Sequence, residues 1–257
     1  MGKIFDSHSH YNDKAFREDY PQILQKIQQA GVDRVINVGA DLESSRLALN
    51  QARENDFMYC SIGIHPETAG QALDDSVMAR LKEMLADPKA VAVGEAGLDY
   101  YYDERESDRV QKEAFIRQIE LANRLDKPLI IHTRDAMKDT LDILEQHPLK
   151  HGVVHCYSGS RESCKTLVKM GLYIGFTGVV TFKNARRALE SLHVVPPERL
   201  LIETDCPYMA PTPLRGQRCD SSMLHYTAQK IADELGFTKE QIIDITADNA
   251  RRLFGIK

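Results

Sequence analysis

The chain has 257 residues, of which 42% are hydrophobic and 28% are charged, and its formal net charge at pH 7 is −5. This composition is typical of a globular protein and excludes a chain that is disordered throughout. No apolar run approaches the roughly 18 residues that a membrane-spanning helix needs. Because non-specific nucleic-acid binders are usually basic, a nucleic-acid role here would depend on a local basic patch. No apolar signal region follows Met1, so we expect a cytoplasmic protein.

Short apolar runs alternate with segments of helical period along the chain. The runs that we interpret as strands are residues 3–5, 34–38, 57–64, 90–93, 128–131, 152–154, 172–176 and 200–202. The intervening segments, such as residues 20–30 and 110–125, carry apolar side chains at helical spacing. After the eighth run, residues 222–235 predict a helix, and residues 238–241 form a capping box that starts a last helix.

Strands that alternate with helices predict a parallel sheet. Eight such units in about 250 residues predict an α/β fold, a (β/α)₈ TIM barrel with an extra C-terminal helix, as one domain over residues 1–257. A doubly wound open sheet is the alternative. That fold often has a glycine-rich phosphate loop after its first strand, whereas residues 6–10 read Asp-Ser-His-Ser-His.

Side chains that can bind metal follow six of the predicted strands. They are His8 and His10, His65, Glu95 and Asp99, His132, His155, and Glu203 and Asp205. The C-terminal strand ends of a barrel carry its active site, so these residues should gather there. Alternate residues of a strand share a face, so each of the pairs His8/His10 and Glu203/Asp205 should point the same way. A single histidine at a strand end is usually structural, but the whole set predicts a metal site.

The ligand types indicate which metals and which chemistry to expect. Imidazole and carboxylate suit Zn, Mn, Fe, Co or Ni, and no cysteine thiolate is placed to help. Four of these histidines and two of the carboxylates already exceed what one tetrahedral ion needs; they are His8, His10, His132, His155, Glu95 and Asp205. Glu95 is the candidate to bridge two ions. Two ions close together would lower the pKa of a shared water and stabilise a displaced oxyanion. The sequence therefore predicts hydrolysis.

Motifs along almost the whole chain resemble the TatD family of metal-dependent hydrolases, which belongs to the amidohydrolase-like barrels. The matching motifs are FDSHSH at 5–10, GIHP at 63–66, GEAGLDY at 94–100, PLIIHTR at 128–134, HCYSG at 155–159, YIGFTG at 173–178, LIETDCPY at 201–208 and NARRLFG at 249–255. So many linked motifs are specific to this family.

The resemblance implies two divalent ions per subunit, as Mg²⁺, Mn²⁺ or Zn²⁺. The implied ligands are His8, His10, Glu95 and Asp205 for one ion, and Glu95, His132 and His155 for the other. Asp205 would also orient the attacking water and accept its proton. His65 and Glu203 would contact the substrate or support the ligands.

Family members are mostly deoxyribonucleases, often 3′→5′ exonucleases on single strands. The resemblance therefore implies DNA with single-stranded ends as the partner, and we expect neither a membrane nor an obligate protein partner. Cations that follow the strands would offset the net negative charge; they are Arg134, Arg161, Lys183, Arg186, Arg187, Arg215 and Arg218. Residues 100–102, three tyrosines, would stack on a base or pack the loop, and packing is favoured for two of them.

Two departures from the family pattern concern the substrate. Residues 217–221 replace the usual Lys/Arg-Asn-Glu-Pro, and Glu67 stands where many members have a histidine. One alternative is an amidohydrolase-like enzyme for a small amide, a lactone or an acyl ester, including aminoacyl-tRNA. Such relatives often bridge their metals with a carboxylated lysine, and Glu95 argues against that type. A more remote alternative is a non-catalytic metal-binding module, but no ligand has been lost.

Overall fold

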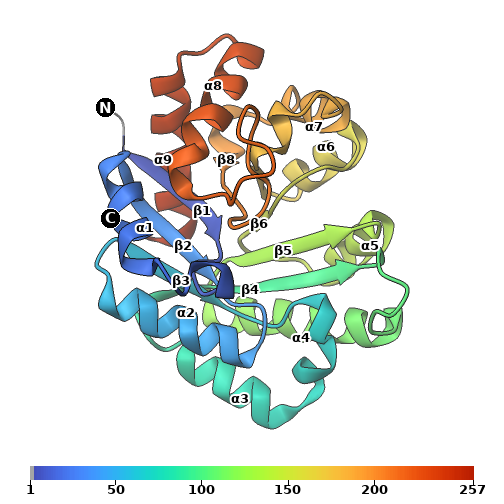
Figure 1. Ribbon diagram of the computed structural model, residues 1–257. Coiled ribbons are helices and arrows are strands. Elements are labelled where there is room, and N and C mark those ends of the chain that lie inside the picture. Colours follow the sequence, from blue (N-terminus) through green and yellow to red (C-terminus); the bar gives the residue numbers. More distant parts are fainter. Residues whose placement is uncertain (1–2) are drawn as a thin grey trace. The chain divides into compact units, whose positions relative to one another are not determined.

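The computed structural model describes residues 3–257; Met1 and Gly2, which are part of the predicted domain 1–257, lie outside the described residues. In this part of the chain, eight strands form one sheet in consecutive order from β1 to β8 (Figure 1). The strands are β1 (Ile4–Ser9), β2 (Val32–Val38), β3 (Met58–Ile62), β4 (Ala90–Asp99), β5 (Leu129–Arg134), β6 (Gly152–Val154), β7 (Tyr173–Phe176) and β8 (Leu200–Ile202). The pairs β3–β4, β4–β5, β5–β6 and β7–β8 are parallel.

An α-helix lies between each strand and the next, and α8 and α9 follow β8. The helices are α1 (Tyr20–Gln29), α2 (Leu42–Glu54), α3 (Asp75–Met84), α4 (Asp108–Leu125), α5 (Met137–Gln146), α6 (Arg161–Lys169), α7 (Arg186–Leu192), α8 (Leu224–Leu235) and α9 (Lys239–Phe254). This order confirms the predicted α/β class, a (β/α)₈ TIM barrel with α9 as the extra C-terminal helix. The predicted capping box is also present, since Thr238 and Gln241 exchange side-chain and backbone hydrogen bonds at the start of α9. No helix within residues 3–257 has the length and apolarity to span a membrane.

Four of the eight strands, β1, β2, β4 and β5, are longer than the apolar pattern indicated, and β1 and β4 differ from it most. The predicted first strand ended at Phe5 and the fourth at Val93, but β1 continues to Ser9 and β4 to Asp99. The added residues include polar ones that are buried, such as His8 and Glu95. Hydrophobic periodicity cannot detect buried polar positions. These two candidate ligands therefore lie inside strands rather than after them.

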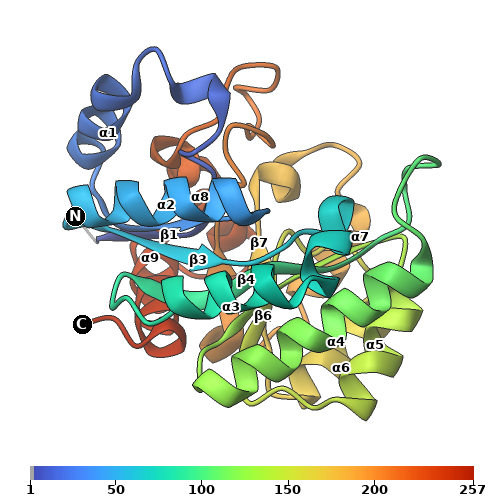
Figure 2. The same ribbon diagram turned by 90° about the horizontal axis from the view of Figure 1, so that it is seen from below.

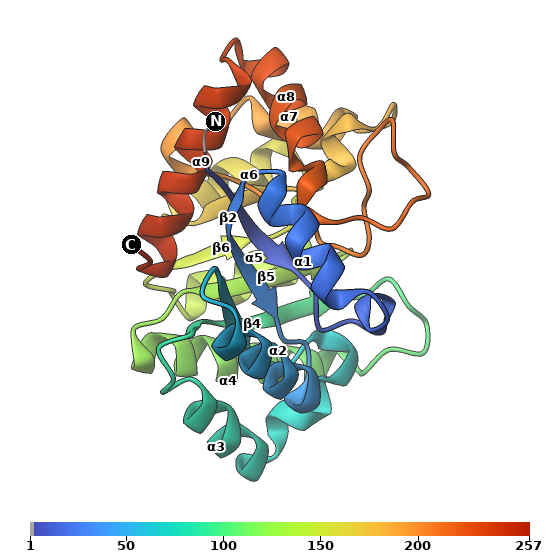
Figure 3. The ribbon, with the colours of Figure 1, turned by 60° about the vertical axis from the view of Figure 1, so that its left-hand side comes forward.

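The chain divides into two compact units, which are described separately. The first unit comprises residues up to Ile36, Cys156–Lys169 and Tyr173–Lys257. In it a parallel bridge between Ser9 and Cys206 places the end of β1 beside the segment that follows β8. Helix α9 packs on β1, where Phe5 and Phe254 stack with ring centroids 6.1 Å apart, and α8 packs on α9 (Figure 3). This packing brings β1, near the start of the described residues, together with the C-terminal helix.

The second unit comprises Asn37–His155 and Met170–Leu172. Helix α2 packs on β3 and α4 on β4, and α3 packs on α2. In the view from below, α3 and α4 lie in front of the strands of this unit (Figure 2). Gln111 of α4 is buried and bonds both backbone groups of Asp99, with its Oε1 2.8 Å from the amide N and its Nε2 2.9 Å from the carbonyl O. The helix thus fixes the end of β4, where candidate site residues lie.

Candidate metal centre

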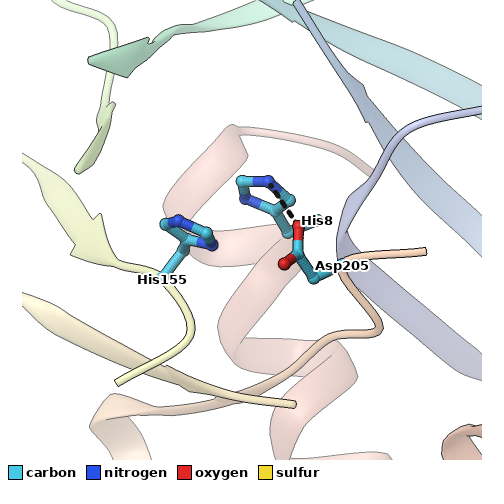
Figure 4. Close-up of side chains that lie close together, drawn as sticks. All are labelled: His8, His155 and Asp205. Atoms are coloured by element: carbon cyan, nitrogen blue, oxygen red, sulfur yellow. Dashed lines mark ion pairs between the residues drawn. The ribbon is translucent and has the colours of Figure 1, made fainter. Parts of the chain in front are cut away.

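In the first unit, His8, His10 and Asp205 bring three ligand atoms together. The Nε2 atoms of His8 and His10 are 3.1 Å apart. Asp205 Oδ1 lies 3.6 Å from His8 Nε2 and 3.4 Å from His10 Nε2. Figure 4 shows the side chains of His8 and Asp205 with the ion pair between them. The backbone N–H of Asp205 donates to the carbonyl of His8 at 2.9 Å, so the bridge between β1 and the segment after β8 sets this geometry.

Asp6 supports these candidate ligands through hydrogen bonds with the backbone beside them. Its carboxylate is completely buried and accepts hydrogen bonds from the backbone N–H groups of His8 (3.3 Å) and Thr204 (3.0 Å). It also accepts from the hydroxyls of Thr204 (2.7 Å) and Ser221 (2.6 Å). Burial raises the pKa of Asp6 to about 6, although the hydrogen bonds oppose this change. Because His8 is a candidate ligand and Thr204 precedes the candidate ligand Asp205, Asp6 positions two of the three candidate ligands through hydrogen bonds to the backbone.

Glu203 is also completely buried in the first unit. Its carboxylate accepts hydrogen bonds from the Ser7 hydroxyl at 3.2 Å and from the backbone N–H of Cys156 at 2.5 Å. A Cβ at Gly175 would lie 2.4 Å from the Glu203 carboxylate, so the glycine provides the space that this side chain occupies. Of the two roles that the sequence leaves open for Glu203, these contacts favour support of the site over substrate contact.

In the second unit, Glu95, His132 and His155 form a second group of ligand atoms. Glu95 Oε1 lies 2.8 Å from His132 Nδ1 and 2.6 Å from His155 Nε2. The two imidazole nitrogens are 3.1 Å apart. Glu95 comes from β4 and His132 from β5, whereas His155, which is labelled in Figure 4, follows β6 directly.

Asp99 and His65 flank this second group. Asp99 Oδ2 lies 3.1 Å from His132 Nε2, the nitrogen that does not face Glu95. The His65 ring is 4.5 Å from the His132 ring, and its Nε2 is 3.9 Å from Glu95 Oε1. Burial lowers the pKa of His65 to about 3. Burial also acts to lower the pKa of His132, but hydrogen bonds with Asp99 and Glu95 raise it to about 9.

Asp99, like Asp6, is a site residue to which the sequence analysis assigned no specific role, although Asp99 was noted among the side chains that can bind metal. The available signal was strand alternation, because Glu95, Gly97 and Asp99 share a face once β4 is known to extend so far. A carboxylate on the second nitrogen of a histidine ligand fixes the tautomer of the ring and raises its basicity. The guanidinium of Arg134, another predicted site residue, packs over the ring of Tyr101.

The distances in the first group suit a divalent cation, and those in the second group are somewhat shorter than the spacing around such an ion. Ligand atoms about 2.1 Å from an ion stand about 3.0 Å apart in octahedral and about 3.4 Å apart in tetrahedral coordination. The separations are 3.1–3.6 Å in the first group and 2.6–3.1 Å in the second. Nitrogen and carboxylate oxygen are ligands that such ions accept. The prediction that Glu95 also binds the ion of His8, His10 and Asp205 stays a prediction.

Comparison with known proteins identifies the family. The model of the family described as TatD related DNase matches residues 5–255. An uncharacterized metal-dependent hydrolase of Bacillus subtilis, YabD, is 40% identical over 255 residues, which cover 98% of this chain and 99% of that one. A 3′-5′ ssDNA/RNA exonuclease, TatD of Rahnella sp., is 34% identical over 251 residues, covering 94% of each chain.

Solved structures agree with this assignment. The crystal structure of YjjV, a TatD homolog from Escherichia coli K12, matches with a TM-score of 0.91 and 28% identity over 99% of this chain and 98% of that one. A TatD family hydrolase from Entamoeba histolytica has a TM-score of 0.88 at 19% identity, with both chains covered completely, and shows the same fold. Together with the histidine and carboxylate groups described above, these matches show that the chain belongs to the TatD family of metal-dependent hydrolases.

Proposed function

We propose that this hydrolase is a deoxyribonuclease that removes nucleotides in the 3′→5′ direction from single-stranded DNA ends. The observation that supports the proposal is that three ligand atoms lie close together in the first unit, and three more in the second, at distances near those around a divalent ion. The name of the Rahnella relative supports a nucleic-acid substrate.

In this proposal each group binds one divalent ion, Mg²⁺, Mn²⁺ or Zn²⁺. Such ions, when bound, lower the pKa of a water molecule and neutralise the charge of a phosphodiester. Glu95 lies within hydrogen-bond distance of both His132 and His155, so its carboxylate is the centre of the second group. Asp99 then keeps His132 in the tautomer that leaves Nδ1 for the ion.

The chain's own residues supply the proton transfer and the substrate contacts. Asp205 orients the attacking water and accepts its proton, as a carboxylate fixed by its backbone bond to His8 is suited to do. His65, beside Glu95 and His132, contacts the substrate, and Glu203 supports the site from the interior. Arg134 is exposed at the end of β5 and binds a phosphate of the strand.

The test is cleavage of single-stranded DNA labelled at either end. Metal-stripped protein, resupplied with Mg²⁺ or Mn²⁺, is expected to shorten the strand stepwise from its 3′ end. Asp205→Asn should abolish this ladder, and Asp233→Asn, a change at an exposed carboxylate of α8, should leave it intact. Absence of cleavage by wild-type protein that carries two ions would contradict the proposal and would direct the search to small esters, amides or aminoacyl-tRNA.

A further inference from the structure

An exposed cluster of aromatic and cationic side chains lies at the C-terminal ends of β4 and β5 in the second unit. It consists of Tyr101, Tyr102 and Arg134, and we call it the tyrosine ledge. Tyr101 is 55% exposed and Tyr102 is 46% exposed. Their rings meet edge to face, with centroids 5.0 Å apart and an interplanar angle of 87°. The sequence favoured packing for two of the three tyrosines at 100–102, without saying which, but both Tyr101 and Tyr102 are exposed.

Arg134 is fixed against both rings. Its guanidinium carbon lies 3.5 Å from the centroid of Tyr101 and 5.2 Å from that of Tyr102. Its Nη1 also donates to the Tyr102 hydroxyl at 3.3 Å. A guanidinium held over aromatic rings keeps its charge and its remaining N–H donors, which suit a phosphate oxygen. The ledge therefore combines an aromatic surface with a positioned cation.

The ledge is tied to the second group of ligands. The backbone N–H of Tyr101 donates to Asp99 Oδ1 at 2.9 Å, while Asp99 Oδ2 contacts His132 Nε2 at 3.1 Å. The backbone N–H of Tyr100 donates to the carbonyl of Arg134 at 2.9 Å, which joins the two chain segments of the ledge. A group bound on the ledge would thus lie near the residues that we propose to bind an ion.

The position and chemistry of the ledge fit a nucleobase. Exposed aromatic rings beside a cation are the usual device for binding single strands, because every base has a π face that can stack. We infer that the ledge binds the end of a single-stranded nucleic acid, with a base stacked on the exposed part of the Tyr101 ring and the adjoining phosphate on Arg134. This inference rests on the proposed nuclease function and adds a contact that holds the substrate regardless of its sequence.

The test compares oligonucleotides that carry a base at a given position with oligonucleotides that lack it. The substrates are single-stranded oligonucleotides that are identical except for one abasic residue, placed in turn at each of the last few 3′ positions. At one position wild-type protein should prefer the base in kcat/KM by about 5- to 150-fold, which is the range that stacking on one aromatic residue gives. Tyr101→Ala should lose that preference, and Tyr101→Phe should retain it. Tyr226→Ala, at an exposed tyrosine of α8, should behave as wild type.

A binding measurement separates the ledge from catalysis. An oligonucleotide with 2-aminopurine at the preferred position should lose fluorescence when it binds Asp205→Asn protein, and the added change Tyr101→Ala should remove this quenching. Circular dichroism should show that the variants are folded. Cleavage by wild type with equal base preference in Tyr101→Ala would overturn the ledge alone. No cleavage by wild type would overturn the proposed nuclease function, and the quenching experiment would then decide whether the ledge binds bases.

Discussion

The two groups of ligands contain the same residue types, but the protein supports them differently. In the first unit, Asp6 bonds the backbone N–H groups of His8 and Thr204 and is itself buried in a hydroxyl network. In the second unit, Asp99 contacts the ring of a ligand, His132, directly. Support through the backbone couples a ligand group to the fold, whereas support through a ring nitrogen adjusts a single ligand. The comparison predicts that a change at Asp6 should lower both the stability of the protein and its metal affinity, whereas a change at Asp99 should lower mainly its metal affinity.

The largest effect is expected at the centre of the second group. Glu95→Gln removes the carboxylate that contacts both His132 and His155, and hydrolysis of DNA should fall by about 10³-fold or more. Steady-state rates on labelled DNA measure this loss. The matched control is Glu145→Gln, at an exposed carboxylate of α5, and it should retain wild-type rates. If Glu95→Gln kept most of the activity, the second group would not take part in hydrolysis.

The next effect concerns the first group. Asp205→Asn keeps the backbone bond to His8 but removes the carboxylate charge, and the rate should fall by about 10²- to 10⁴-fold as for other proton acceptors. The loss should appear in kcat more than in KM, because substrate contacts remain. A variant with a raised KM and an unchanged kcat would show that Asp205 binds substrate instead.

A change at Asp6 should lower both the free energy of unfolding and the metal affinity of the first group. In Asp6→Asn, an N–H₂ group takes the place of one carboxylate oxygen. In one orientation of the amide, this group faces the two hydroxyls that now donate to Asp6; in the other, it faces the two backbone N–H groups. The free energy of unfolding should fall by about 1–3 kcal/mol, the cost of a buried unsatisfied polar group. Metal affinity of the first group should also weaken, by about 10- to 100-fold. Urea denaturation and metal titration would measure both, and an unchanged stability would contradict the assigned role.

The smallest effect on the fold is expected at Asp99. Asp99→Asn retains the shape of the side chain and the backbone bonds to Gln111 but weakens the contact with His132. Metal affinity of the second group should fall by about 10-fold, with little change in unfolding free energy. If Asp99→Asn destabilised the protein as much as Asp6→Asn did, the distinction between the two modes of support would be lost.

The sequence predicted the repeating architecture well because it depends on local patterns. All eight strands are present, and the ligand atoms of the predicted metal-binding residues lie close to one another. Strand lengths were less predictable, since β1 and β4 continue through buried polar residues. The roles of Asp6 and Asp99 were missed for a related reason. Their partners Thr204 and His132 are distant in sequence, and periodicity gives no information about such contacts.

The most direct test of the account is the number of ions that the protein binds. Metal-stripped wild-type protein, Glu95→Gln and Asp205→Asn would be saturated with Mn²⁺, freed of excess ion and analysed by mass spectrometry of the metal. Two ions per chain are expected for wild type and one for Asp205→Asn, because the second group keeps all its ligands in that variant. Glu95→Gln should hold one ion at most, because Glu95 is predicted to serve both groups. One ion in wild type, or loss of both ions in Asp205→Asn, would contradict the account.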